Sequence, residues 1–150
     1  MKKEKNILWI FGALAAVLGV LFFASDLPLS IFRGGPAKPV PGKVYELTVD
    51  NLSAARRNAP VLIALFTTRG NMAGARMSRG LGFLASRVKD RAIVAAGNLD
   101  DEPGLAAKAG VAELPAWVIY RDGQEVSRAT GDNADLSLDR FIEEQTGKAP

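Results

Sequence analysis

Residues 98–126, NLDDEPGLAAKAGVAELPAWVIYRDGQEV, decide the fold of this chain. An apolar strand predicted over residues 92–99 ends inside this stretch. The acidic residues 100–102 and Pro103 then favour the first turn of a helix. Gly110 favours the end of that helix, because glycine readily adopts the left-handed conformation that closes a last turn. The stretch therefore opens with a strand followed by a short helix.

The second part of the same stretch predicts a hairpin. Residues 116–120 form a continuous apolar run of strand length. Asp122-Gly123 is a strong signal for a tight turn, and residues 125–130 supply the returning strand.

The rest of the chain adds strands and helices in alternation. The pattern predicts a strand at 44–48, a helix at 52–57 capped by Asp50, a buried strand at 61–67, a helix at 73–88 and a last helix at 138–145 capped by Asp135 or Ser137. Buried strands that alternate with helices indicate an α/β fold with a mostly parallel sheet, to which the hairpin adds an antiparallel edge.

The composition removes several kinds of chemistry. The chain contains no cysteine and no histidine. It therefore has no thiol nucleophile, no disulfide, no cysteine-ligated zinc or iron–sulfur cluster, and no imidazole base. Residues 36–150 hold 15 Lys and Arg against 14 Asp and Glu, a net charge of +1, which is not the footprint of a nucleic-acid-binding protein.

An uncharged apolar segment lies near the start of the chain. Lys2, Lys3 and Lys5 precede residues 7–24, an 18-residue run that would rise about 27 Å as a helix and cross most of a hydrocarbon core. The run is longer than the apolar part of a cleaved signal peptide, and bulky Phe22 stands where cleavage requires a small residue. We therefore predict an uncleaved anchor with a cytoplasmic N-terminus, and a cleaved signal peptide is the alternative.

The segment boundaries follow from these features. Residues 25–43 hold four prolines and three glycines, which is typical of an extended spacer. The expected organisation is a cytoplasmic N-terminus at 1–6, a transmembrane helix at 7–24, a linker at 25–43, a globular domain at 44–146 and a tail at 147–150.

The stretch at residues 98–126 resembles the second half of a thioredoxin. In that family a strand ends in Asn-x-Asp, a proline-capped helix follows, and a Gly-Val/Ile-x-x-Ile/Leu-Pro turn leads to a strand and a glycine-containing hairpin. The first half, from Val44 through VLIALFTTRGNMAGARM at 61–77, matches in the order of its elements. The resemblance implies a thioredoxin-like α/β fold, with a mixed central sheet flanked by helices, and a cis peptide bond before Pro115.

Thioredoxins carry Cys-x-x-Cys at the start of the helix that follows the first buried strand. Aligned without a gap, the two cysteine positions fall on Gly70 and Ala73, with Asn71 and Met72 between them. A register shift of one or two residues moves the pair along the chain without meeting a thiol. Disulfide exchange requires a thiolate nucleophile and a resolving thiol, so the resemblance points to the redox-inactive members of the superfamily.

Two further positions depart from the thioredoxin pattern. The buried acid that serves as proton relay in the family falls on Ala64, and the aromatic residue before the first cysteine falls on Arg69. The proton acceptor is therefore missing together with the thiols.

The family's peptide-binding groove would lie between residues 70–73 and the loop Leu114-Pro115-Ala116. In that mode the backbone beside the proline pairs with an extended partner segment. The fold requires both turns even without a ligand, so a structural interpretation stays equally open. Trp117 is interpreted as a core side chain, with a surface anchor for a partner as the alternative.

Arginines gather near this groove, at Arg69, Arg76 and Arg79. Residues 56–91 hold eight basic residues and one acidic residue (net +7), whereas residues 98–150 hold five basic and eleven acidic residues (net −6). The arginines belong either to solvated helix faces or to a basic face for an acidic partner or anionic headgroups.

No feature of the sequence predicts a metal or cofactor site. Met72 and Met77 are too few for a thioether copper site without histidine. The acidic run at 100–102 is interpreted as the cap of the following helix rather than as a set of metal ligands.

Together these features predict a non-catalytic protein-interaction module, acting as subunit or assembly factor of a membrane or envelope complex. The expected place is a bacterial inner membrane, single-pass, with the domain in the periplasm. The expected partner is a membrane or periplasmic protein, with no nucleic acid and no small-molecule substrate. Two alternatives stay open: a periplasmic chaperone-like factor that holds extended client segments, and a thiol–disulfide role through a partner's cysteines.

Overall fold

A computed structural model describes residues 38–131, 134, 142 and 144 of the chain. Internal contacts divide the chain into residues 1–37 and a compact unit formed by residues 38–150. The predicted anchor at 7–24, most of the linker at 25–43 and most of the last helix at 138–145 lie outside the described residues. Within the described part, none of the helices has the length and apolar character needed to span a membrane.

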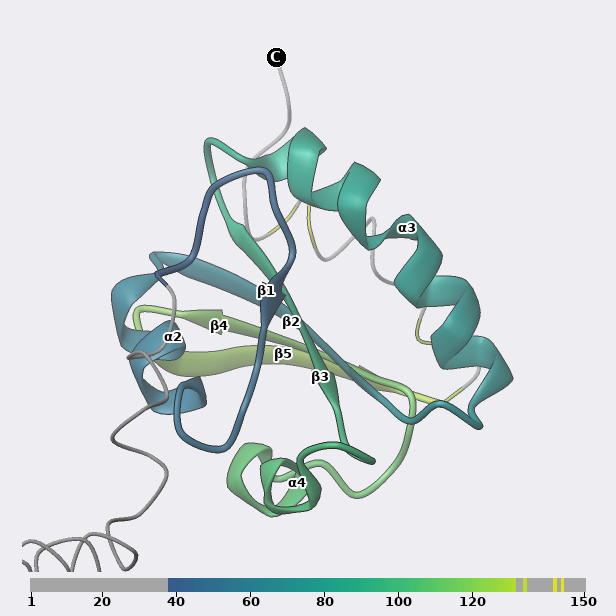
Figure 1. Cartoon of the computed structure of the whole chain (residues 1–150). Helices are drawn as coiled ribbons and strands as arrows, with labels where there is room; N and C mark the ends of the chain where they lie inside the picture. Colours follow the sequence, from purple (N-terminus) through teal and green to yellow (C-terminus); the bar gives the residue numbers. More distant parts are fainter. Residues whose placement is uncertain (1–37, 132–133, 135–141, 143, 145–150) are drawn as a thin grey trace, which may run out of the picture. The chain divides into compact units, whose positions relative to one another are not determined.

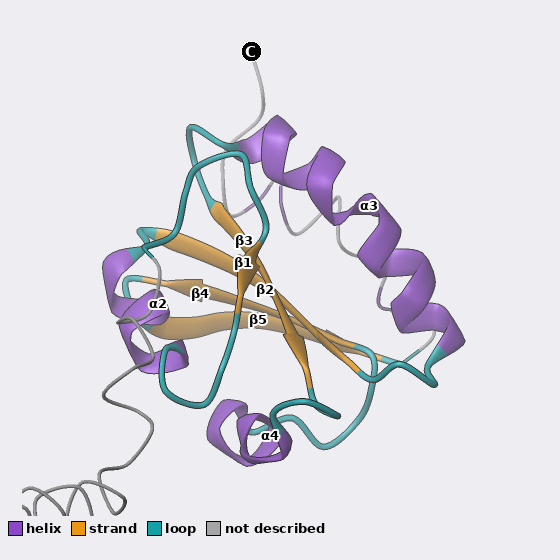
Figure 2. Cartoon of the chain, in the orientation of Figure 1, coloured by secondary structure: helices purple, strands orange, loops and turns teal. Residues whose placement is uncertain are grey.

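Helices and strands follow one another as Figure 2 shows. The elements are β1 (Tyr45–Glu46), α2 (Leu52–Asn58), β2 (Val61–Thr67), α3 (Met72–Val88), β3 (Ile93–Asn98), α4 (Pro103–Ala109), β4 (Ala116–Arg121) and β5 (Gln124–Thr130). The predicted elements at these places are confirmed, with ends displaced by at most three residues and the strand at Val61–Thr67 matched at both ends.

The five strands form one mixed sheet in the order β1-β3-β2-β4-β5. β3 runs parallel to β1 and β2, whereas β4 runs antiparallel to both β2 and β5. This is the mixed sheet that the resemblance implied; its antiparallel part is larger than the hairpin edge expected from the alternation of elements, because it also includes the β2–β4 pair. The reason lies in the connection through α4, which starts where β3 finishes and returns the chain to the same end of the sheet, so β4 must run in the opposite direction (Figure 1).

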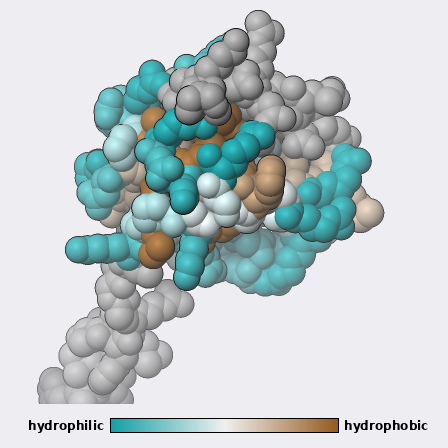
Figure 3. All heavy atoms as spheres, turned by 90° about the horizontal axis from the view of Figure 1, so that it is seen from above, coloured by the Kyte–Doolittle hydropathy of each residue, from teal (hydrophilic) through white to brown (hydrophobic). Residues whose placement is uncertain are grey.

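Strand β2 is buried on both faces, as its continuous apolar run predicted. Because side chains alternate along a strand, Leu62, Ala64 and Phe66 join one hydrophobic cluster and Val61, Ile63 and Leu65 join the other. The first cluster also contains side chains of α2 and α4, and the second contains those of α3. The sheet therefore lies between α3 on one side and α2 with α4 on the other. Seen from above, hydrophobic groups are visible between surrounding hydrophilic ones (Figure 3).

The start of α2 differs from the prediction. Asp50 does not cap this helix; the N-cap residue is Asn51, whose side chain makes no capping hydrogen bond. Asn51 is only 5% exposed. Its amide oxygen accepts from the Thr48 N–H at 2.9 Å, and its amide nitrogen donates to the Glu46 carbonyl at 2.8 Å. The Asn51 side chain thus supplies hydrogen-bond partners to the Thr48 N–H and the Glu46 carbonyl at the end of β1, where a buried polar group without a partner would be destabilising.

The turn signals of the deciding stretch are confirmed. Gly110 ends α4 in the left-handed conformation, with φ 63°. Asp122 and Gly123 both have positive φ values, 50° and 81°, as a tight hairpin turn between β4 and β5 requires.

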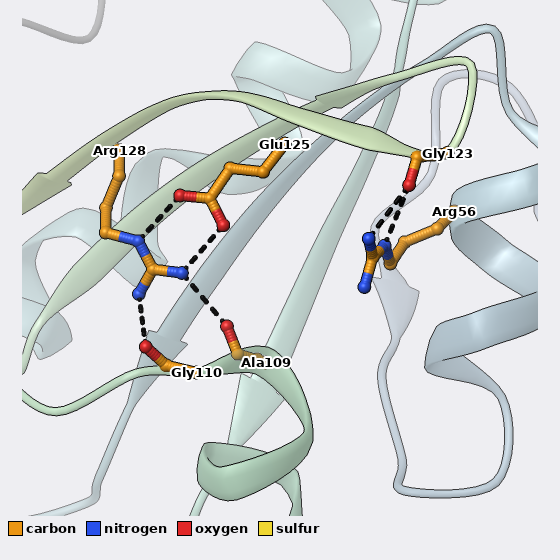
Figure 4. A network of polar contacts seen from close by, with 6 residues as sticks. All are labelled: Arg56, Ala109, Gly110, Gly123, Glu125 and Arg128. Carbon is orange, nitrogen blue, oxygen red and sulfur yellow. Dashed lines mark hydrogen bonds and ion pairs between the residues drawn. The ribbon is translucent and has the colours of Figure 1, made fainter.

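Two arginines that the sequence patterns did not single out fasten the hairpin to the helices (Figure 4). Arg128 on β5 donates to both carboxylate oxygens of Glu125 at 2.8 Å. The same guanidinium donates to the carbonyls of Gly110 at 2.8 Å and Ala109 at 3.0 Å. A cation that binds the last carbonyls of a helix also interacts favourably with its dipole. Arg128 therefore joins β5 to the end of α4.

Arg56 makes the corresponding link from α2. Its guanidinium donates twice to the carbonyl of Gly123, at 2.8 and 3.2 Å, and lies 4.5 Å from the centre of the Tyr120 ring. Burial raises the pKa of the Tyr120 phenol, and the nearby Arg56 charge acts against this rise. The tyrosine is thus a neutral core side chain covered by a cation.

Candidate functional site

Three loops emerge at one edge of the sheet. Phe66 and Thr67 at the end of β2 pair with Gly97 and Asn98 at the end of β3, and Phe66 also pairs with Ala116 at the start of β4. The loops at 68–71, 99–102 and 110–115 therefore come together, although they are far apart in the sequence. The loop with the degenerate positions and the proline loop thus lie at the same edge of the sheet.

The degenerate positions build the start of α3. Asn71 is the N-cap, and its side-chain oxygen accepts from the Gly74 N–H at 2.7 Å. This bond satisfies one of the free donors of the first turn. Gly70 is exposed, Met72 is 83% exposed, and Ala73 is buried against the core. None of these four residues offers a side chain that acts as a nucleophile or a base.

The relay position is filled by apolar packing. Ala64 is fully buried in the cluster beneath α2 and α4, and it pairs with Ala95 on β3 and Val118 on β4. A methyl group at this depth neither accepts nor supplies a proton.

The acidic run at 100–102 does not cap α4, contrary to the prediction. The first turn of α4 contains no acidic residue, and the side chain of Glu102, at the N-cap, makes no capping bond. Asp100 instead accepts from the Arg69 N–H at 2.7 Å, and Asp101 forms an ion pair with the Arg69 guanidinium. Glu102 accepts from the Val49 N–H at 2.9 Å. The fold brings Arg69 and Val49 next to the acidic run, and the carboxylates accept from these residues instead of from the first turn of α4.

The three arginines near the groove, Arg69, Arg76 and Arg79, therefore differ from one another. Arg69 is held to the acidic loop by its backbone and by its side chain. Arg76 and Arg79 are exposed on α3 and make no ion pair with any residue that the structure describes. Of the three arginines, Arg76 and Arg79 therefore have their full charge available for a partner.

The proline loop keeps a backbone that is ready to pair. The bond Leu114-Pro115 is cis, as the resemblance implied. Pro115 is buried, and its carbonyl accepts from the Gly131 N–H at 2.9 Å. Leu114 is partly buried against the core, and within the described residues its N–H and carbonyl have no hydrogen-bond partner. An open donor and acceptor therefore stand next to the start of α3.

Trp117 and Ala116 lie below this surface. Trp117 is 3% exposed and packs in the cluster beneath α3, which confirms the core interpretation and leaves no surface for a partner. Ala116 is fully buried. Glu113, by contrast, is exposed and accepts from the Thr130 hydroxyl at 2.9 Å. Of the proline loop, Leu114 is the residue that can meet a partner.

Metal ligation finds no support at this edge. Over residues 38–131 and the three described residues beyond them, no group of three or more Asp or Glu side chains is placed to hold a metal ion.

Known proteins share this arrangement of elements. No family model matches the chain. A thioredoxin from Chlamydia caviae is 37% identical over 49 residues, which are 33% of this chain and 48% of that protein, so the match spans about half the length of this relative. A thioredoxin variant from Halobacterium salinarum superposes with a TM-score of 0.64 at 23% identity, covering 76% of this chain and all of that one.

A thioredoxin from Malassezia sympodialis gives a TM-score of 0.63 at 15% identity, covering 74% of this chain and 96% of that one. At this level of identity the likeness concerns the fold. The chain thus has a thioredoxin-like fold in which no cysteine is present at the edge where the proline loop meets the start of α3.

Proposed function

We propose that this chain is a non-catalytic interaction module that holds an extended segment of a partner protein at Leu114. The observation that carries the proposal is the open N–H and carbonyl of Leu114, next to a helix start that has no thiol at Gly70 or Ala73. Pairing through these two groups would add a short strand without any chemical step. Specificity would come from side chains around the loop.

Met72 supplies the apolar part of such a contact. Its side chain is 83% exposed at the first position of α3, directly after the loop at 68–71 that emerges beside β4. A flexible thioether adapts to partner side chains of different shapes. Backbone pairing at Leu114 and apolar contact at Met72 together define the binding edge that we propose.

Site-specific photo-crosslinking tests this edge. A photoreactive amino acid replaces Met72 in one variant and Val126 in a control, because Val126 is also an exposed apolar residue but lies on β5. We expect a discrete adduct from position 72 and none of that size from position 126. Identical adducts from both positions, or none from position 72, would contradict the proposed edge.

The proposal also excludes thiol–disulfide catalysis by this chain. Insulin reduction with dithiothreitol measures that activity directly. We expect no turnover above the uncatalysed background, because neither cysteine position carries a thiol. Turnover would show that another group acts, or that a partner's cysteines complete the site.

The setting that we propose is a bacterial inner membrane, with residues 7–24 as the anchor and the domain in the periplasm. The support is the 18-residue apolar run behind three lysines. Within a membrane or envelope complex the chain would act as a subunit or assembly factor, and the linker at 25–43 would give the domain reach.

The absence of native cysteines allows a clean test of this topology. Single cysteines at Lys3 and at Gln124, which is exposed on β5, are labelled with a membrane-impermeant maleimide on spheroplasts. We expect Gln124→Cys to react at once and Lys3→Cys to react only after lysis. Labelling of both positions in intact spheroplasts would contradict an N-in anchor.

A chaperone-like role is the second candidate, and the exposed Met72 is the observation that favours it. A permissive apolar side chain suits many extended clients, whereas a fixed subunit has one persistent partner. The same crosslinking experiment separates the two roles: one adduct indicates a subunit, and a ladder of adducts indicates client binding.

A further inference from the structure

The outward side of α3 carries a line of cationic and apolar side chains. Met72, Arg76, Arg79 and Phe83 are spaced by four, three and four residues, which places them within about 60° of arc around the helix. All four are exposed, and Phe83 is 75% exposed. We call these four residues the outer stripe.

No acidic side chain of α3 neutralises the positive charge of the outer stripe. The 17 residues of α3, MAGARMSRGLGFLASRV, include three arginines and no acidic residue. Arg76 and Arg79 form no ion pair or hydrogen bond with other described residues. Two full positive charges therefore stand between two exposed apolar groups.

The outer stripe faces outward because the opposite side of α3 is buried in the core. This side packs in the cluster beneath α3 through Met77, Leu81, Leu84, Ala85 and Val88. The helix cannot turn Phe83 inward without withdrawing these side chains from the core. Gly80 and Gly82 flank Phe83 around the circumference of the helix. A methyl group added at either glycine would meet nothing within 4 Å, so no side chain covers the helix next to Phe83. The phenyl ring therefore stands out from the helix.

We propose that the outer stripe lies on an anionic phospholipid surface, with Arg76 and Arg79 at the headgroups and Phe83 reaching the acyl boundary. Charge complementarity supports this occupant, since cations near such a surface are attracted individually and aromatic rings favour the interface. The chain outside the described unit supports it too, because 37 residues with an 18-residue apolar run precede the unit. This argument rests in part on the proposed anchor.

The anchor would keep the stripe close to its surface. Residues 25–37, which precede the compact unit, would reach roughly 40 Å if extended at about 3.1 Å per residue, so either side of the domain could turn toward the bilayer. A tethered domain also binds as an intramolecular partner, so a weak contact is sufficient. The stripe would then set which side of the domain faces the membrane.

Vesicle co-sedimentation of residues 38–150 tests the stripe without the anchor. Internal contacts mark residues 38–150 as a compact unit, and this unit holds the described members of both hydrophobic clusters. The probes are vesicles of phosphatidylglycerol mixed with phosphatidylcholine, and vesicles of phosphatidylcholine alone. We expect binding to the anionic vesicles only, and weaker binding at high salt.

Neutral substitutions test the two free cations. We expect Arg76→Gln/Arg79→Gln to weaken binding about 25-fold, at about fivefold for each arginine removed. The control Arg57→Gln/Lys108→Gln changes the net charge equally, on α2 and α4 at the other side of the sheet, and should leave binding unchanged. Equal losses in both variants would show a general charge effect and overturn the proposal.

Phe83→Trp reports on insertion. The only other tryptophan of the unit, Trp117, is buried and supplies a constant background. We expect the emission of the new residue to shift to shorter wavelength with anionic vesicles and to be quenched by brominated lipid. Absence of both changes, or absence of any wild-type binding to anionic vesicles, overturns the proposal and leaves an acidic protein as the partner of the stripe. The maleimide labelling of the full chain tests the anchor separately, so the two failures are distinguishable.

Discussion

Gly74 is the position where a single methyl group tests how the candidate site is assembled. A Cβ added there would lie 1.8 Å from the Thr67 hydroxyl oxygen and 2.8 Å from the Thr67 Cβ. Thr67 is the last residue of β2, and Gly74 lies in the first turn of α3. Rotation of the threonine side chain removes only the first contact, because its Cβ is fixed by the strand. The helix would have to move away from the sheet.

A glycine-to-alanine substitution at Gly80, also in α3, is expected to raise the free energy of unfolding, whereas the substitution at Gly74 lowers it. At Gly80 an added Cβ meets nothing within 4 Å, so Gly80→Ala should stabilise by about 1 kcal/mol through helix propensity. At Gly74 that gain is offset by an overpacking cost of about 1–3 kcal/mol, and more where the backbone must shift. We expect Gly74→Ala to destabilise by about 1–2 kcal/mol. The two variants should differ by about 2–3 kcal/mol, or roughly 10 °C in melting temperature.

Urea denaturation of residues 38–150, followed by the fluorescence of buried Trp117, measures both changes. Thr67→Ala in the Gly74→Ala background removes the closest contact and should recover part of the loss, which a double-mutant cycle would show as coupling. If Gly74→Ala is as stable as Gly80→Ala, the close approach between β2 and α3 does not exist as described, and the reasoning about the site's geometry fails.

Three further variants test the polar contacts, each through its denaturation midpoint. Asn71→Ala removes the cap of α3 and should cost about 1 kcal/mol, whereas Asn71→Asp keeps an acceptor and should be nearly neutral. Hydrogen bonding to Arg128 lowers the pKa of Glu125, so the stabilisation by this pair is fully present above the unfolded-state value of about 4.3 and is lost as the pH falls through the lower folded value. The stability difference between wild type and Glu125→Gln should therefore shrink from pH 7 to pH 3. It should be under about 1 kcal/mol, because the carboxylate is more than one-third exposed. Arg56→Gln loses its bonds to the hairpin and its contact with a buried ring, at a cost of about 1–2 kcal/mol; an unchanged midpoint would contradict that link.

The positions of the elements could be predicted from local patterns. The run Val61–Thr67 is a strand buried on both faces because every residue from 61 to 66 is apolar, and the structure confirms it. Gly110 and the Asp122-Gly123 pair mark their turns because few other residues accept positive φ at low cost. The absence of a thiol at Gly70 and Ala73 also needs no structure, since the chain contains no cysteine at all.

The candidate site could be predicted only in part. The sequence indicated which loops form it, but not which of its groups are free. The sequence groups Arg69 with Arg76, either on a solvated helix face or on a basic face, yet Arg69 is bonded to the acidic loop and Arg76 is not. The exposure of Phe83 likewise depends on which side of α3 the core takes.

The sequence by itself determined the order of strands and helices, the turns and the loss of thiol chemistry, because each of these depends on residue types within a short span. Only the tertiary structure decided the roles of residues 100–102. A local pattern predicted a helix cap, but Asp100 binds a backbone N–H 31 positions away and Glu102 binds one 53 positions away. A carboxylate takes the strongest donors within reach, and the packing of the sheet decides which donors those are.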